Sequence, residues 1–400
     1  MARIPVSAVP PATGGWGAIG AVAGLAVGWV FHLDGIASWM LLLGFAAAPM
    51  WFCEWRALPE RSMDVRFDFR DYLVGVALIA LLFWGSMQIQ GLVGSAKGQG
   101  VGLFTLPILA ACGLMAICAL VRPDLLNPTV PACGQLAISV VKGQRPQSHH
   151  MLALLGWVVK AVFLPLMLAW SFTWVVGAAN AWYERTDLAA FTVAMTLLYA
   201  VDTAFATVGY LSTSERINGQ IRSVDKTMLG WVSALACYPP LSVLVLDTWL
   251  VYKTAMDWTA WISSGSVLAW IWGAAIIVLT GIYTWSTVAF GPRFSNLTNR
   301  GIITSGPYRW GKHPAYVCKN LSWWLIYVPF VSGDTALGAL IHCLALLGVN
   351  GIYGVRAWTE ERHLGNDPDY QAYAEWISRY GWAARAKRLI RGAQPAEPKA

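Results

Sequence analysis

The residues of this chain that could do chemistry gather in two short stretches near its end. Residues 304–316 read TSGPYRWGKHPAY and include His313, while residues 356–364 read RAWTEERHL and include the carboxylates Glu360 and Glu361. The apolar segment between them is long enough for a membrane hairpin. Ionisable groups crowded at the end of such a hairpin need a partner, because unpaired charge near hydrocarbon is costly. A polar cofactor is one such partner.

Local rules place these side chains at one mouth of the hairpin. Pro314 disfavours helix for His313 and favours a helix that starts after it, so His313 is expected where the first apolar helix begins. Arg356 and Glu360 are four residues apart and therefore share one face at the end of the second helix, whereas Glu361 is expected to point elsewhere. The spacing thus predicts a cation, an acid and an imidazole close together.

The two stretches resemble the integral-membrane methyltransferases that include isoprenylcysteine carboxyl methyltransferase and the membrane phospholipid N-methyltransferases. The pattern of that family is G-x-Y-x-x-x-R-H-P-x-Y, an apolar hairpin, R-x-x-x-E-E-x-x-L and then Y-x-x-Y. The resemblance covers about the last quarter of the chain, which departs from it at Lys312, where Arg is usual, and at Cys318, where Gly is common. The positions in register are Gly306, Tyr308, His313, Pro314, Tyr316, Arg356, Glu360, Glu361, Leu364, Tyr370 and Tyr373.

The resemblance implies a methyl transfer from S-adenosyl-L-methionine and assigns roles to individual positions. It implies that Arg356 faces the methyl acceptor, and we expect the catalytic residues to be Arg356 and Glu361. The residues just before the first motif align with a strip that contacts the cofactor in the carboxyl methyltransferases. The expected cofactor-binding residues are Arg300, Gly301, Ile302, Ile303, Gly306, Tyr308, His313, Pro314, Tyr316 and Glu360.

These residue types suit the groups that S-adenosyl-L-methionine carries. Glu360 could bind its ammonium or its ribose hydroxyls, and either His313 or a backbone N–H near Gly306 could bind its carboxylate. The aromatic faces of Tyr308 or Tyr316 suit the purine or the sulfonium, the latter as a cation–π contact. The in-line displacement at a methyl group requires proximity and exclusion of water more than covalent catalysis.

The sequence leaves the methyl acceptor open among a carboxyl group on a prenylated thiol, a phospholipid amine, a small thiol and an isoprenoid. A carboxylate acceptor needs no base, and Arg356 could orient it as a bidentate fork. An amine, thiol or hydroxyl acceptor needs a base, for which Glu361 and His363 are the candidates. We expect a lipophilic small molecule or lipid to enter from the membrane.

Two other functions compete with methyl transfer. The membrane sterol reductases, which use a nicotinamide cofactor, resemble this C-terminal arrangement, but they have Asn where Ala315 stands and lack the E-E-x-x-L continuation. A non-enzymatic membrane protein with a decayed C-terminal unit is the third hypothesis, and the intact site residues argue against it.

Composition predicts an all-α, polytopic transmembrane protein, and the resemblance implies that a C-terminal helical hairpin is its catalytic unit. The chain is 57% apolar and 12% charged, against about 25% charged in soluble domains. Apolar runs near 20 residues recur along the chain, and 23 tryptophans are typical of belts at the two membrane interfaces. About ten spans are expected, near residues 15–32, 36–53, 72–89, 101–121, 151–178, 188–211, 228–247, 259–288, 317–331 and 335–357.

The basic residues predict the orientation of these spans. The loops at 55–71, 122–150, 212–227 and 291–312 each hold three or four Lys or Arg, and the alternate loops hold at most one. By the positive-inside rule both termini and the active site face the cytoplasm, and we expect the inner membrane of a bacterium. The net charge of +7 therefore indicates contacts with membrane lipids and not with nucleic acid.

The family motif is confined to the C-terminal part, so we divide the chain into three regions. Residues 1–254 form a transmembrane region of about seven spans and unassigned role, residues 255–392 form the catalytic region, and residues 393–400 form a disordered tail. The basic, aromatic segment from Tyr370 onward is expected to lie as a helix on an anionic leaflet. The seven cysteines include no C-x-x-C pair, so neither a disulfide framework nor a metal site is predicted.

Lys160, Asp202 and Lys319 are charged residues that fall inside predicted apolar runs. Lys160 and Asp202 are expected at similar depth in consecutive antiparallel spans, and an ion pair between them would relieve the cost of burying each charge. Lys319 lies near a predicted membrane surface, where its long side chain is expected to snorkel to the interface.

The predicted topology can be tested with reporter fusions. Fusions at Ala96 and Lys253 should report the outside of the membrane, and fusions at Gly143 and Asn218 should report the cytoplasm, because the basic loops stay inside. The opposite result at two or more of these positions contradicts the orientation.

Overall fold

Apolar runs fold into long helices because a helix satisfies its backbone hydrogen bonds internally where no water is present. The computed structural model describes residues 4–57, 68–93, 101–121, 127–184, 188–253, 256–331 and 335–391. Within these residues the chain is an all-α, multi-pass membrane protein. The eight helices long and apolar enough to cross a membrane are α1 (Pro11–Val30), α2 (Gly35–Arg56), α3 (Phe69–Val93), α4 (Thr105–Val121, preceded by η2, Val101–Phe104), α6 (Ser148–Glu184), α7 (Ala189–Leu211), α10 (Val267–Phe290) and α12 (Ala336–Leu364).

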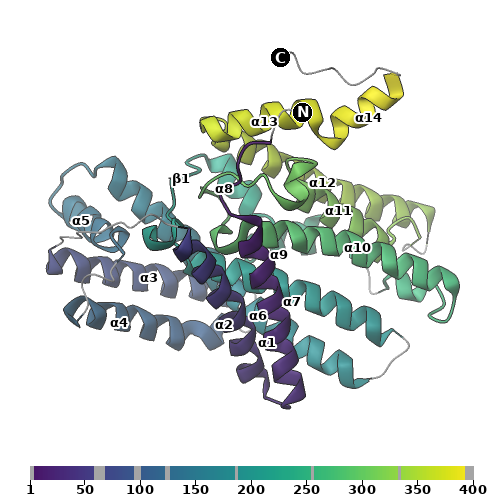
Figure 1. Cartoon of the computed structure of the whole chain (residues 1–400), viewed down its shortest axis with the longest axis horizontal. Coiled ribbons are helices and arrows are strands. Elements are labelled where there is room, and N and C mark those ends of the chain that lie inside the picture. The colour runs from purple at the N-terminus through teal and green to yellow at the C-terminus, as the bar shows by residue number, and fades with distance from the viewer. Residues whose placement is uncertain are drawn as a thin grey trace.

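Shorter elements connect these helices. Before α10 they are α5 (Thr129–Val141), η4 (Glu215–Ile217), β1 (Ser223–Val224), α8 (Met228–Leu235), α9 (Leu241–Leu244), η5 (Val245–Trp249) and η6 (Trp258–Ala260). After α10 they are η7 (Gly291–Arg293), β2 (Thr298–Asn299), η8 (Gly306–Arg309), α11 (Pro314–Tyr327), α13 (Pro368–Tyr380) and α14 (Trp382–Arg391). In Figure 1, α6 and α7 lie in the middle of the molecule. Helices α3, α4 and α5 lie on one side of this pair, and α10, α11 and α12 lie on the other side. Helices α13 and α14 lie beside the N-terminal segment.

Two of the ten predicted spans are not membrane-length helices, so the number found is eight. The expected span at 228–247 breaks at Pro239 and Pro240, neither of which can donate a backbone N–H to continue α8. The expected span at 317–331 contains the 14-residue α11, which ends at Tyr327 and is followed by Val328 in a left-handed conformation just before Pro329. The loop expected at 332–334 and the tail at 393–400 lie outside the described residues.

Helix α5 was not predicted and lies in a segment that was expected to be a loop. It packs on α3 at a very close approach, because a Cβ on Gly75 would lie 2.0 Å from the Val130 carbonyl oxygen and one on Gly134 would lie 1.8 Å from that of Asp71. Small residues are typical of such contacts between membrane helices, because they let the two backbones meet. This close packing on α3 stabilises α5, which is too short to cross the membrane.

The predicted ion pair between Lys160 and Asp202 is wrong. Asp202 turns towards α10, where its carboxylate accepts hydrogen bonds of 2.6 Å from both the Tyr283 and the Thr287 hydroxyls. Lys160 lies on the face of α6 that turns towards α5, and its Nζ stands 3.9 Å from the centre of the Trp157 ring. Helices α6 and α7 do pack together. The Lys160 side chain, however, points from α6 towards α5, and the Asp202 side chain points from α7 towards α10.

A buried ion pair joins the N-terminal helices to the start of the C-terminal part. Arg293 Nη2 lies 2.8 Å from Glu54 Oε2, and the two side chains are 3% and 2% exposed. The segment before α1 also bonds to residues 302–304. Ala8 N donates to Ile302 O at 2.9 Å, and Thr304 Oγ1 donates to Pro5 O at 2.7 Å. The first helices therefore help to hold residues 293–304 in place.

This ion pair generates a stability prediction. Glu54→Gln should lower the free energy of unfolding by about 3–5 kcal/mol, because it leaves the Arg293 guanidinium buried without a counter-charge. Adding Arg293→Met should recover part of that loss, which unfolding curves in detergent can measure.

Glu375→Gln is the matched control, since Glu375 is exposed and its removal should change stability little. Strictly additive losses in the double variant would contradict the coupling.

Candidate active site

Residues 294–304 form a strip whose position is set by one buried arginine, Arg300. Its guanidinium donates to five backbone carbonyls, at distances of 2.7–3.1 Å. Burial and the nearby Arg293 lower the pKa of Arg300 to about 9, so the guanidinium remains charged at neutral pH. The accepting carbonyls belong to Gly209, Ser212, Gly219, Pro292 and Phe294.

Two short strands hold the same strip against the loop that follows α7. Ser223 pairs with Asn299 and Val224 pairs with Thr298 in an antiparallel ladder. Gly301, the next residue but one after this ladder, has φ +105°, a value that favours glycine. The strip thus turns sharply away from the ladder towards the first motif.

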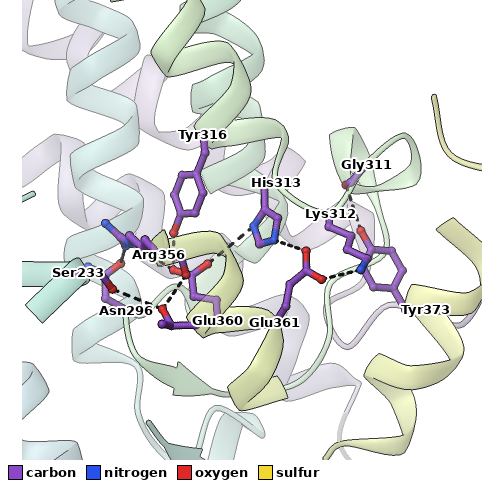
Figure 2. A network of polar contacts seen from close by, with 11 residues as sticks. Ser233, Asn296, Gly311, Lys312, His313, Tyr316, Arg356, Glu360, Glu361 and Tyr373 are labelled. Atoms are coloured by element: carbon purple, nitrogen blue, oxygen red, sulfur yellow. Dashed lines mark hydrogen bonds and ion pairs between the residues drawn. The ribbon is translucent and has the colours of Figure 1, made fainter. Parts of the chain in front are cut away.

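The first motif brings His313 and Lys312 to the same carboxylate. His313 precedes the first residue of α11, as predicted, and its Nε2 lies 3.0 Å from Glu361 Oε1. Lys312 Nζ lies 2.7 Å from Glu361 Oε2 (Figure 2). His313 also stacks on the Tyr316 ring, with 5.5 Å between ring centres and 4° between planes. Glu361 is therefore fully engaged by the loop before α11.

Glu360 belongs to a second, more buried network. The Tyr316 hydroxyl donates to Glu360 Oε1, and Arg356 Nε donates to the same oxygen at 3.2 Å. Arg356 Nη2 donates to Asn296 Oδ1 at 2.6 Å, and the Arg356 side chain is 4% exposed. His313 Nδ1 stands 3.9 Å from Glu360 Oε2 and so links the two networks (Figure 2). The cation, acid and imidazole predicted from the spacing do lie together.

The C-terminal helix α13 closes the first motif from outside. The Tyr373 hydroxyl lies within hydrogen-bonding distance of two carbonyl oxygens, 2.8 Å from Tyr308 O and 3.1 Å from Gly311 O, which share its one hydrogen (Figure 2). Burial, and to a smaller extent Glu361, raises the pKa of Tyr373, so its phenol stays neutral. Burial likewise raises the pKa of Tyr308 well above its usual range. Tyr370 and Tyr373, the last two positions of the family pattern, thus belong to the packing that shapes the loop.

These elements enclose a cavity of about 170 Å³. Most of the predicted site residues line it, but Gly306, Pro314 and Glu361 do not. The predicted residues in the lining are Arg300, Gly301, Ile302, Ile303, Tyr308, His313, Tyr316, Arg356 and Glu360.

The cavity also contains residues that the sequence did not reveal. Asn296 bonds Arg356, and Tyr238 lies under the Arg356 guanidinium at 5.6 Å from ring centre to Cζ. The break at Pro239 and Pro240, next to Tyr238 in an apolar run, is the sequence signal that could have indicated this position. No comparable signal marks Asn296.

Lys319 is a further lining residue, and its predicted snorkelling to the interface is wrong. Its Nζ lies 5.1 Å, 5.3 Å and 5.7 Å from the ring centres of Tyr283, Trp323 and Tyr353. The three rings enclose the ammonium within the cavity instead. A second cation therefore faces the same space as Arg356.

The cavity wall also has unused hydrogen-bonding capacity. Thr298 Oγ1 is buried without a hydrogen-bond partner among the described residues, and Thr298 lines the cavity. A buried polar atom left unpaired costs free energy, so a polar ligand in the cavity would relieve that cost. The described residues contain no group of three or more His, Cys, Asp or Glu arranged to hold a metal ion.

Comparison with protein families finds a match in the C-terminal part of the chain. Residues 267–366 match the model of the isoprenylcysteine carboxyl methyltransferase (ICMT) family. The chain is thus a multi-pass membrane methyltransferase, and its C-terminal part carries an isoprenylcysteine carboxyl methyltransferase-type domain. Comparison with curated proteins and with solved structures finds no match.

Proposed function

We propose that the protein transfers a methyl group from S-adenosyl-L-methionine to a lipophilic carboxylate. The observation that carries this proposal is the position of Glu360, a carboxylate presented at the cavity wall by Tyr316 and Arg356. One oxygen of Glu360 is held in a fixed network while the carboxylate lines the cavity, and such an acid suits an ammonium or a pair of ribose hydroxyls. When bound, S-adenosyl-L-methionine supplies an electrophilic methyl group on a sulfonium.

The remaining cavity residues fit the other groups of this cofactor. Residues 300–303 line the cavity together with Thr298, whose hydroxyl has no hydrogen-bond partner among the described residues, so this strip offers polar contacts. The stacked rings of His313 and Tyr316 present aromatic surface at the mouth. We assign to Arg300 a role in positioning the strip, because all five of its contacts are with backbone carbonyls.

The acceptor is proposed from the charges that face the cavity. Arg356 and Lys319 both line it, and two cations favour an anionic acceptor. An amine or thiol acceptor would require a free base to take up its proton. Glu361 is instead bonded to Lys312 and His313, and His363 Nε2 lies 3.2 Å from Ser223 Oγ. A carboxylate, which needs no base, therefore suits this site better than an amine or a thiol.

The domain division and the orientation are also proposed. We infer a catalytic region at 255–392, oriented with both termini and the site towards the cytoplasm of a bacterial cell. Two lining residues, Asp225 and Tyr238, lie before this boundary. The region at 1–254 thus contributes to the cavity, and this contribution supports a role for it in completing the site.

Cofactor binding should depend on Glu360 and His313. Glu360→Gln keeps the shape of the side chain and removes its charge, so affinity for S-adenosyl-L-methionine should fall by about 1–3 kcal/mol in isothermal titration calorimetry. His313→Ala should also weaken binding, because it removes the stacking partner of Tyr316. Glu375→Gln, on the exposed face of α13, is the matched control and should bind normally. Unchanged binding in both site variants would place the cofactor elsewhere.

Arg356 should serve the acceptor more than the cofactor. Arg356→Lys keeps the charge but loses the guanidinium fork, so turnover of a prenylated cysteine carboxylate should fall about tenfold or more. The affinity for S-adenosyl-L-methionine should hold. Arg362→Lys changes an exposed arginine bonded to Thr227 and should leave both quantities unchanged. An equal fall in cofactor affinity and turnover in Arg356→Lys would reassign Arg356 to the cofactor.

A further inference from the structure

A second cavity, of about 230 Å³, lies in the N-terminal region between α6, the start of α5 and the loop that follows α7. One face of α6 forms its long wall, because the lining residues of this helix recur at helical spacing over 11 residues, or about 16 Å. This cavity shares no lining residue with the candidate active site. The residues of the α6 wall are His149, Leu152, Ala153, Gly156, Trp157 and Lys160.

Lys160 brings a buried amine into this cavity, and no acidic side chain pairs with it among the described residues. It is 6% exposed, and its Nζ lies 3.9 Å from the centre of the Trp157 ring, a cation–π contact. A cation–π contact stabilises an ammonium, but it supplies no counter-charge. A buried ammonium at this depth in a membrane protein is costly unless an anion accompanies it. An anion bound beside Lys160 would therefore stabilise the ammonium form of this side chain.

The surroundings of Lys160 are fixed in place before any ligand arrives. Trp157 Nε1 donates to Thr129 Oγ1 at 3.0 Å, and Thr129 Oγ1 donates in turn to Asn127 Oδ1 at 2.8 Å. Across the cavity, Gln220 Oε1 is buried without a hydrogen-bond donor among the described residues. The wall thus presents both a cation and an unused acceptor.

We propose that this cavity binds a carboxylate of single negative charge on a small apolar body. Lys160 is the inner cation, and the exposed residues His149 and Glu215 mark the open side. The Glu215 carboxylate at this mouth opposes a doubly charged group such as a phosphate monoester. Apolar side chains form most of the remaining wall, among them Ala132, Leu152, Ala153 and Ile221.

The site lies close to the strip of the candidate active site without being part of it. Gln220 and Ile221 face the second cavity, and only two residues later Ser223 pairs with Asn299 of that strip. Arg300 donates to the carbonyl of Gly219, next to Gln220. One loop therefore forms a wall of the second cavity and a support of the first.

Octanoate binding to the full-length protein in phosphatidylcholine nanodiscs tests this proposal. Wild-type protein should bind octanoate, measured by isothermal titration calorimetry, and Lys160→Met should weaken the binding at least tenfold because the counter-charge is gone. Lys142→Met is the matched control, since it makes the same change at an exposed lysine of the same region and should bind normally. Octan-1-ol should bind at least tenfold more weakly than octanoate.

A second variant keeps the test valid if Lys160→Met fails to fold. Ala153→Leu keeps the lysine and fills the cavity, so it should also weaken octanoate binding. Equal octanoate binding in wild type, Ala153→Leu and any folded Lys160→Met would overturn the proposal. Octan-1-ol binding as tightly as octanoate, or octyl phosphate binding more tightly, would overturn the assignment of a monovalent carboxylate.

Discussion

The cost of placing charge beside hydrocarbon is the constraint on which the C-terminal site depends. Arg356 and Glu360 lie at the end of an apolar helix, and neither can be buried there alone. Each is satisfied by the other and by one neutral partner, Asn296 for Arg356 and Tyr316 for Glu360. This sharing leaves part of each group facing the cavity. The Arg356–Glu360 pair is therefore stable in its buried position and still has hydrogen-bonding capacity for a ligand.

Part of this arrangement follows from local rules. Pro314 starts α11 and leaves His313 at its mouth, and the four-residue spacing of Arg356 and Glu360 brings both to one face. Asn296 and Tyr238 could not be predicted in this way, because their places depend on the packing of segments about 60 and 118 residues away from Arg356 along the chain. Periodicity reports which residues share a face, but it does not report which distant loop that face meets.

The number of spans shows the same limit for the fold. Composition correctly predicted the all-α membrane class, because eight long apolar helices produce a strong signal. Two of the predicted spans failed where prolines interrupt an apolar run, at Pro239 and Pro240 and again near Pro329. Apolar character says only that a segment avoids water. Whether such a segment crosses the bilayer or folds against other helices depends on its hydrogen bonds and neighbours.

Buried charges tie the helices of the first 250 residues to the C-terminal part of the chain. Asp202 is satisfied by hydroxyls of Tyr283 and Thr287 on α10, and Glu54 is satisfied by Arg293 at the end of that helix. Both contacts cross from the N-terminal region to the helix that leads into residues 293–304. If α10 and the η7 turn that follows it moved away, Asp202 and Glu54 would lose these partners and would be left as poorly compensated buried acids. The N-terminal helices therefore fix the position of α10 and, through Arg293, of the strip that lines the cavity.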